Sequence, residues 1–159
     1  MPVKINLNNI NINAPWFFHV RHFIKLMANT EDWRIKSNEL AKLRNVCNFQ
    51  GKNIEFIPQI LKNTLINYEK KIYLSGKILT RNILHDFFNS IIWLQFPKIK
   101  SCLNFLHIVQ IKKKVLVESA GKRGIYSDAI TLFDENGVIF ITSDAEIVSL
   151  LKSHKWQSA

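Results

Sequence analysis

Apolar and polar positions follow a helical period over most of the chain. Apolar side chains three or four residues apart indicate helices, because such positions share one face of a helix. Proline, glycine and capping residues mark where each helix begins or ends. On this basis we expect helices over residues 16–27, 30–47, 62–74, 80–96 and 98–112, and a short extended segment over residues 55–59.

The last third of the chain has a different pattern, in which two apolar runs flank a turn. Residues 129–133 and 138–142 are rich in β-branched and aromatic side chains, and Asp-Glu-Asn-Gly lies between them at 134–137. An Asn-Gly pair between two such runs is typical of a β-hairpin. The sequence Ser-Asp-Ala-Glu at 143–146 is a capping box, which predicts a final helix from that point.

The predicted fold class is α+β, a mainly helical single domain with one β-hairpin near the C-terminus. A chain of 159 residues, 47% of them hydrophobic, is long enough to bury a substantial core. The first 13 residues include five asparagines and are expected to form a flexible N-terminal arm. Residues 14–159 then form the globular domain.

The predicted helix over residues 80–96 carries an unusual polar face. Asn82, His85, Asp86 and Asn89 recur at helical spacing, and they are short hydrogen-bonding groups where a solvated face would carry Lys and Glu. His85 is the candidate general acid or base, because an imidazole titrates near neutral pH. Asn89 can hold the His85 imidazole in one tautomer or bind a substrate oxygen. Arg81 can bind an anion.

Two further segments are expected to meet this face. Pro97 ends the helix and begins the next, which carries Asn104 and His107 on its polar side. A basic glycine loop over residues 121–124 precedes Asp128. We therefore predict a pocket with His85, Asn89 and Asp128 as the catalytic candidates. Its predicted ligand-binding residues are Arg81, Asn82, Asp86, Asn104, His107 and Arg123.

Two other interpretations of these polar residues stay open. In the first, they form a buried polar network that ties the helix to residues 121–128, each group satisfied by backbone partners. In the second, His85, Asp86 and Asp128 join His19 and His22 in the scattered pattern of metal-dependent phosphohydrolases. Asn is a poor zinc ligand and Arg81 would repel a dication, so no metal ligand and no cofactor are assigned.

The net charge of +10 suggests a nucleic-acid partner only weakly. The chain has 17 Lys against 5 Arg, with 22 Ile and 16 Asn, an excess that AT-rich codons can produce. Arg provides most directional phosphate and base recognition. We therefore expect a pocket for a small-molecule or phosphate-containing ligand with a hydrolase-like site. The alternative is a non-enzymatic interaction module with a basic surface for RNA or protein.

No membrane partner and a cytoplasmic location are expected from the remaining features. No apolar run approaches the roughly 18 residues that a membrane span needs. The start of the chain lacks the layout of a signal peptide. Cys47 and Cys102 lack metal-ligand or redox spacing, which is typical of reduced thiols.

Several short stretches, taken together, resemble a known family. They are Phe56-Ile57-Pro58-Gln59, Tyr68-Glu69, Gly76, Thr80-Arg81, His85-Asp86-Phe87-Phe88-Asn89, Trp93, Phe96-Pro97-Lys98, Leu103-Asn104, Arg123-Gly124 and the run from Asp128 to Gly137. In this order they resemble the uncharacterised proteobacterial domain-of-unknown-function family numbered three thousand and twenty-five. The resemblance implies no activity, and because its members look longer at the C-terminus, it implies a shortened member.

Overall fold

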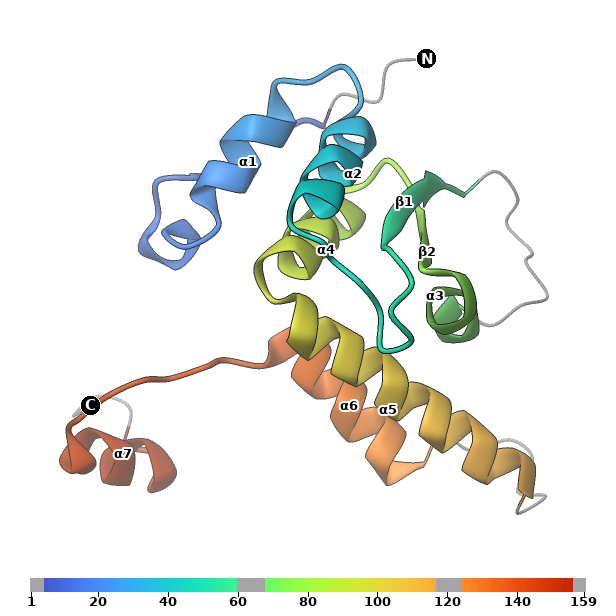
Figure 1. The fold of residues 1–159 in the computed structure, drawn as a ribbon. Coiled ribbons are helices and arrows are strands. Elements are labelled where there is room, and N and C mark those ends of the chain that lie inside the picture. Colours follow the sequence, from blue (N-terminus) through green and yellow to red (C-terminus); the bar gives the residue numbers. More distant parts are fainter. Residues whose placement is uncertain (1–4, 60–67, 117–123, 156–159) are drawn as a thin grey trace.

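The computed structural model describes residues 5–59, 68–116 and 124–155, with the side chains of 114–116 excepted, and within them the chain is mainly helical (Figure 1). In chain order the elements are η1 (Pro15–Phe17), α1 (Arg21–Ala28), α2 (Trp33–Leu43), β1 (Glu55–Pro58), α3 (Tyr68–Ser75), β2 (Lys77–Thr80), α4 (Leu84–Gln95), α5 (Pro97–Leu116), α6 (Ile125–Asn136) and α7 (Ala145–Lys152). No helix in these ranges is long and apolar enough to cross a membrane.

The predicted mainly helical character is confirmed, and local signals explain where several elements begin. Asp32 caps α2 by accepting a hydrogen bond from the Arg34 backbone N–H. Pro97 begins α5, as predicted, because proline is well tolerated in the first turn of a helix. Asp144 caps α7 by accepting from the N–H groups of Glu146 and Ile147. The predicted final helix is therefore present, capped one residue later than the start of the box.

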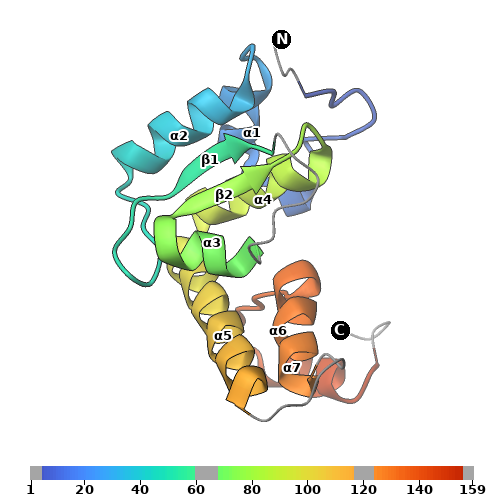
Figure 2. The same cartoon turned by 90° about the vertical axis from the view of Figure 1, so that its right-hand side faces the viewer.

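The sheet is a parallel pair of short strands rather than a hairpin. β1 pairs with β2 in the register Glu55 to Lys77 and Pro58 to Thr80. Parallel neighbours require a crossover connection, and here the connection contains α3. In Figure 2, α2 lies against one side of this pair, and α3 follows its lower edge. Because Thr80 ends β2, α4 begins at Leu84 and not at the predicted residue 80.

The predicted β-hairpin over residues 129–142 is wrong. Residues 129–136 belong to α6, and residues 137–144 form neither strand nor helix. The Asn-Gly pair ends a helix here: Gly137 donates its backbone N–H to the carbonyl of Phe133 at 2.8 Å. Gly137 has a φ of −66°, whereas a type I′ hairpin turn needs positive φ values. An Asn-Gly pair is compatible with a helix end as well as with a hairpin turn. The prediction of a hairpin therefore depended on the flanking apolar runs, which form no strands here.

The hydrophobic core lies between α1, α2, α4 and the two strands. Trp33, Phe87 and Ile91 are fully buried in it, and the rings of Trp33 and Phe87 meet edge to face at 5.7 Å. The division into a flexible arm and a domain from residue 14 stays a prediction, although Ile5 is itself buried in this core. By contrast, no residue of α6 or α7 is buried.

Candidate functional site

A pocket of about 1110 Å³ lies between α3, α4, α5 and α6. Six of the nine residues predicted for the site line it: Arg81, His85, Asp86, Asn89, Asn104 and His107. The two polar rows expected from helical spacing, one on α4 and one on α5, therefore open onto the same space. The break at Pro97 makes this possible, because it turns the chain so that α5 packs against α4.

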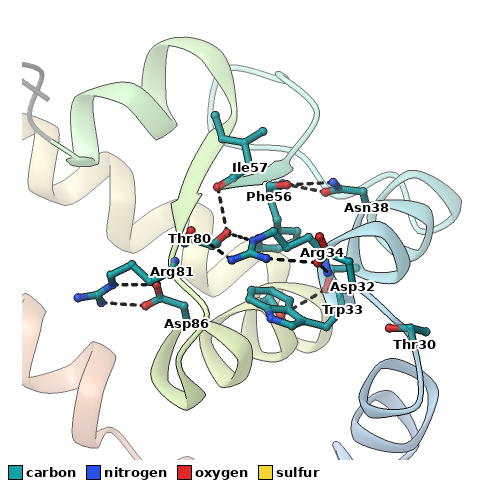
Figure 3. A network of polar contacts seen from close by, with 12 residues as sticks. Thr30, Asp32, Trp33, Arg34, Asn38, Phe56, Ile57, Thr80, Arg81 and Asp86 are labelled. Atoms are coloured by element: carbon teal, nitrogen blue, oxygen red, sulfur yellow. Dashed lines mark hydrogen bonds and ion pairs between the residues drawn. The ribbon is translucent and has the colours of Figure 1, made fainter. Parts of the chain in front are cut away.

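A polar network holds the end of β2 in place, directly before Arg81, which lines the pocket (Figure 3). Arg34, 5% exposed, donates from Nε to the Thr80 hydroxyl at 2.7 Å. The Thr80 hydroxyl donates in turn to the carbonyl of Ile57 at 2.9 Å, across the two strands. On the far side of β1, Asn38 exchanges two hydrogen bonds with the backbone of Phe56, at 2.7 and 3.0 Å. The strand that leads to Arg81 is thus held from both α2 and β1.

Asp86 is buried and anchors the start of α4. Its carboxylate accepts the backbone N–H of Arg81 at 2.6 Å, and the Nε and Nη2 of the same arginine at 3.0 and 2.9 Å (Figure 3). These bonds raise the pKa of the Arg81 guanidinium above its ordinary value. Asp86 therefore binds both the backbone and the side chain of Arg81. The positive charge of Arg81 is consequently already matched by a carboxylate.

A second ion pair joins α5 to α6 across the pocket. Lys100 is buried, and its Nζ donates to the two carboxylate oxygens of Asp134 at 2.6 and 2.9 Å. Both residues line the pocket. Sequence reasoning did not assign Asp134 to the site, because the predicted hairpin placed it in a turn. No signal in the sequence marks it, because its place beside Lys100 depends on the packing of α6 on α5.

Tyr68 brings a hydroxyl into the pocket from the first turn of α3. The tyrosine as a whole is 39% exposed, but its hydroxyl lies among the polar groups of the pocket and hydrogen-bonds the Asn89 side chain. Burial raises the pKa of this hydroxyl, and the carboxylates of Glu69, Asp86 and Asp134 raise it further, while the bond to Asn89 lowers it. Tyr68 therefore stays protonated at neutral pH, as a hydrogen-bond donor.

Asn104 is held rigidly on the α5 side of the pocket. Its Nδ2 donates to the backbone carbonyl of Glu69 at 3.0 Å and to the carboxylate Oε2 of Glu69 at 2.7 Å. These two acceptors determine which way the amide points. Its Oδ1 is buried and has no hydrogen-bond partner among the described residues. Within the described part of the chain, this buried acceptor is therefore left unsatisfied.

Two of the described residues that were predicted for the site are not among those that line the pocket. Asn82 is exposed in the bend before α4, and Asp128 is exposed in the first turn of α6. Arg123 lies outside the described residues. The pocket therefore contains His85 and Asn89 from the predicted catalytic group, without Asp128. In the described ranges, no three His, Cys, Asp or Glu side chains lie close enough to hold a metal ion.

Comparison with known proteins adds a family without an activity. A family model described as "Protein of unknown function (DUF3025)" matches residues 54–159. The search of curated proteins found no match, and the search of solved structures found none. Every residue that lines the pocket lies inside the matched region. The comparisons therefore assign no chemistry to the site, and its function has to be inferred from its geometry.

Proposed function

The chain belongs to the DUF3025 family of proteins of unknown function, and we propose that it binds a small polar molecule in the pocket between α3, α4, α5 and α6. The observation that carries the proposal is the convergence of polar side chains from four helices on one cavity. A volume of about 1110 Å³ is slightly above the usual range of about 300–1,000 Å³ for small-molecule sites. Six of the lining residues were predicted from the sequence.

The walls of the pocket combine apolar surface with a few oriented polar groups, as small-molecule sites do. Trp93 and Leu103 are buried and supply apolar surface. Tyr68 and Asn104 supply fixed hydrogen-bonding atoms because other protein groups hold their side chains. His107 is half-buried on α5, and His85 is exposed at the edge of α4. This arrangement supports recognition of a polar ligand with apolar parts.

Binding, and not hydrolysis, is the function that we propose. Asp86 is committed to Arg81, and Asp134 is committed to Lys100. Both carboxylates are engaged in these ion pairs, and Asp128 lies outside the lining. A hydrolase-like role for His85, Asn89 and Asp128 stays a prediction from the sequence.

The alternative, a basic surface for RNA or protein, also stays a prediction. Lys112 and Lys113 are exposed in the last turns of α5. Cations at that end of a helix offset the helix dipole, so their presence has a purely local reason.

A thermal-shift screen against small polar metabolites tests the proposal. The wild-type chain is compared with Thr131→Trp, which places an indole in the cavity from α6, and with Leu132→Trp on the exposed side of the same helix. A ligand present at 100 times its Kd stabilises the folded state by about 2.7 kcal/mol. We expect such a ligand to raise the Tm of the wild type and of Leu132→Trp, but not that of Thr131→Trp.

The two tryptophan variants also define the contradicting result. If every ligand that stabilises the wild type stabilises Thr131→Trp equally, binding occurs elsewhere and the proposal is wrong. Circular dichroism of both variants establishes that each retains its helices.

A further inference from the structure

The charges that line the pocket are unevenly divided. Apart from the histidines, the described lining residues include four carboxylates and two cations. The carboxylates are Glu69, Asp86, Asp134 and Glu135, and the cations are Arg81 and Lys100. With both histidines neutral, the balance is two negative charges, from four carboxylates against two cations. This balance is opposite in sign to the net charge of +10 of the whole chain.

The two cations are poorly placed to receive an anionic ligand. Arg81 contacts both oxygens of Asp86, and Lys100 contacts both oxygens of Asp134. The charge of each cation is therefore already matched by a carboxylate through two short contacts, which weakens its attraction for a phosphate or carboxylate ligand.

Three of these carboxylates also act on the Tyr68 hydroxyl, which lies in the pocket. Burial raises its pKa most, and the carboxylates of Glu69, Asp86 and Asp134 raise it further. The groups come from three different helices, α3, α4 and α6. Carboxylates from three helices therefore act on the same hydroxyl.

Asn104 provides an independent sign that a donor is missing. Its side chain is nearly fully buried, at 3% exposure for the residue, and its Oδ1 has no partner among the described residues. An unsatisfied buried acceptor costs about 1–3 kcal/mol. A bound N–H donor would remove this cost, because the amide orientation is already set by Glu69.

We infer that the ligand carries a protonated amine, which the pocket receives through the Asn104 carbonyl and the carboxylates around it. This inference rests on the proposed function and adds the class of the ligand. The pocket can select a cationic ligand although the whole chain is positively charged, because salt screens the charges of the rest of the chain beyond about 8 Å.

Three probes of equal length test the inference: 1,4-diaminobutane, 1,4-butanediol and succinate, a dication, a neutral diol and a dianion. Calorimetric titration at constant ionic strength measures each affinity for the wild type, for Glu69→Gln and for Thr131→Trp. The Glu69→Gln substitution keeps a side-chain acceptor for the Asn104 amide while it removes one charge. We expect the diamine to bind best, and Glu69→Gln to weaken it about tenfold. Glu146→Gln, on exposed α7, is the matched control and should leave the affinity unchanged.

The outcomes separate this inference from the proposed function. Preferential binding of succinate that Thr131→Trp abolishes would overturn the amine and leave the pocket as a binding site. Diamine binding that Glu69→Gln and Glu146→Gln reduce equally would be nonspecific charge attraction, and would also overturn the inference. Binding of none of the probes, together with no stabilising metabolite in the screen, would overturn both.

Discussion

The region around Trp33 and the region after residue 124 have similar apolar content, yet they are packed very differently. In the first, α1, α2, α4 and both strands enclose side chains such as Phe87 and Ile91 completely. In the second, no residue of α6 or α7 is buried, and Val138 and Ile141 between them are 81% and 90% exposed. Figure 1 shows residues 137–144 as an extended segment that leads from α6 to α7.

The difference shows that an apolar pattern specifies an element only where another element packs on it. In the region around Trp33, other elements pack on the helices, so α4 buries apolar side chains such as Phe87, Ile91 and Leu94. After residue 124, local signals decide instead: Gly137 ends α6 and Asp144 begins α7. α6 packs on α5, and the ion pair between Lys100 and Asp134 joins the two.

The same substitution in the two regions should give the largest contrast. Ile91→Ala leaves a cavity in a fully buried site and should lower the free energy of unfolding by about 3 kcal/mol. Ile141→Ala removes a side chain that is 90% exposed and should change it by less than about 0.5 kcal/mol. Urea denaturation followed by circular dichroism measures both. A loss for Ile141→Ala that matches the loss for Ile91→Ala would mean that the last third is packed after all.

A pair of threonine substitutions should sharpen the comparison for polar groups. Thr80→Val deprives the buried Arg34 Nε of its acceptor and should cost about 2 kcal/mol. Thr131→Val removes a hydroxyl that donates to the carbonyl of Ser127 within α6, and should cost about 0.5 kcal/mol or less. The same denaturation experiment measures these two variants. Equal costs would show that the network behind the pocket adds no more stability than a helix surface bond.

Removing the charge of Asp134 should change the global stability least, and its effect should be confined to one helix. Asp134→Asn keeps an acceptor for Lys100 but loses the charge assistance, which is worth about 1 kcal/mol. Because α6 packs on α5 at the edge of the fold, the loss should appear as local opening of α6. Amide hydrogen exchange should accelerate in α6 and stay unchanged in α4. Equal acceleration in both helices would mean that they unfold as one unit.

Sequence reasoning could predict the parts of the site that periodicity carries. His85 and Asn89 on one helix, and Asn104 and His107 on the next, were found because helical spacing and Pro97 need no knowledge of tertiary contacts. Arg34 was not found, because its partner Thr80 is 46 positions away and only the packing of α2 on the strands brings them together.

Two further residues were missed for reasons of local structure. Thr80 fits a helix N-cap as well as a strand end, and the pairing of β2 with β1 decided between them. Asp134 was assigned to a hairpin turn, so its place beside Lys100 could not be foreseen. In both cases the chain carries a signal that two structures share, and long-range packing makes the choice.

The side-chain amide resonance of Asn104 tests the central claim most directly. Nuclear magnetic resonance of the full chain, titrated with 1,4-diaminobutane or succinate at constant ionic strength, follows this group as its carbonyl gains or fails to gain a donor. We predict a saturable shift of the Asn104 amide with the diamine, and none with succinate. A shift with succinate alone, or an Asn104 amide that neither probe moves, would contradict the assignment of this pocket to an amine-bearing ligand.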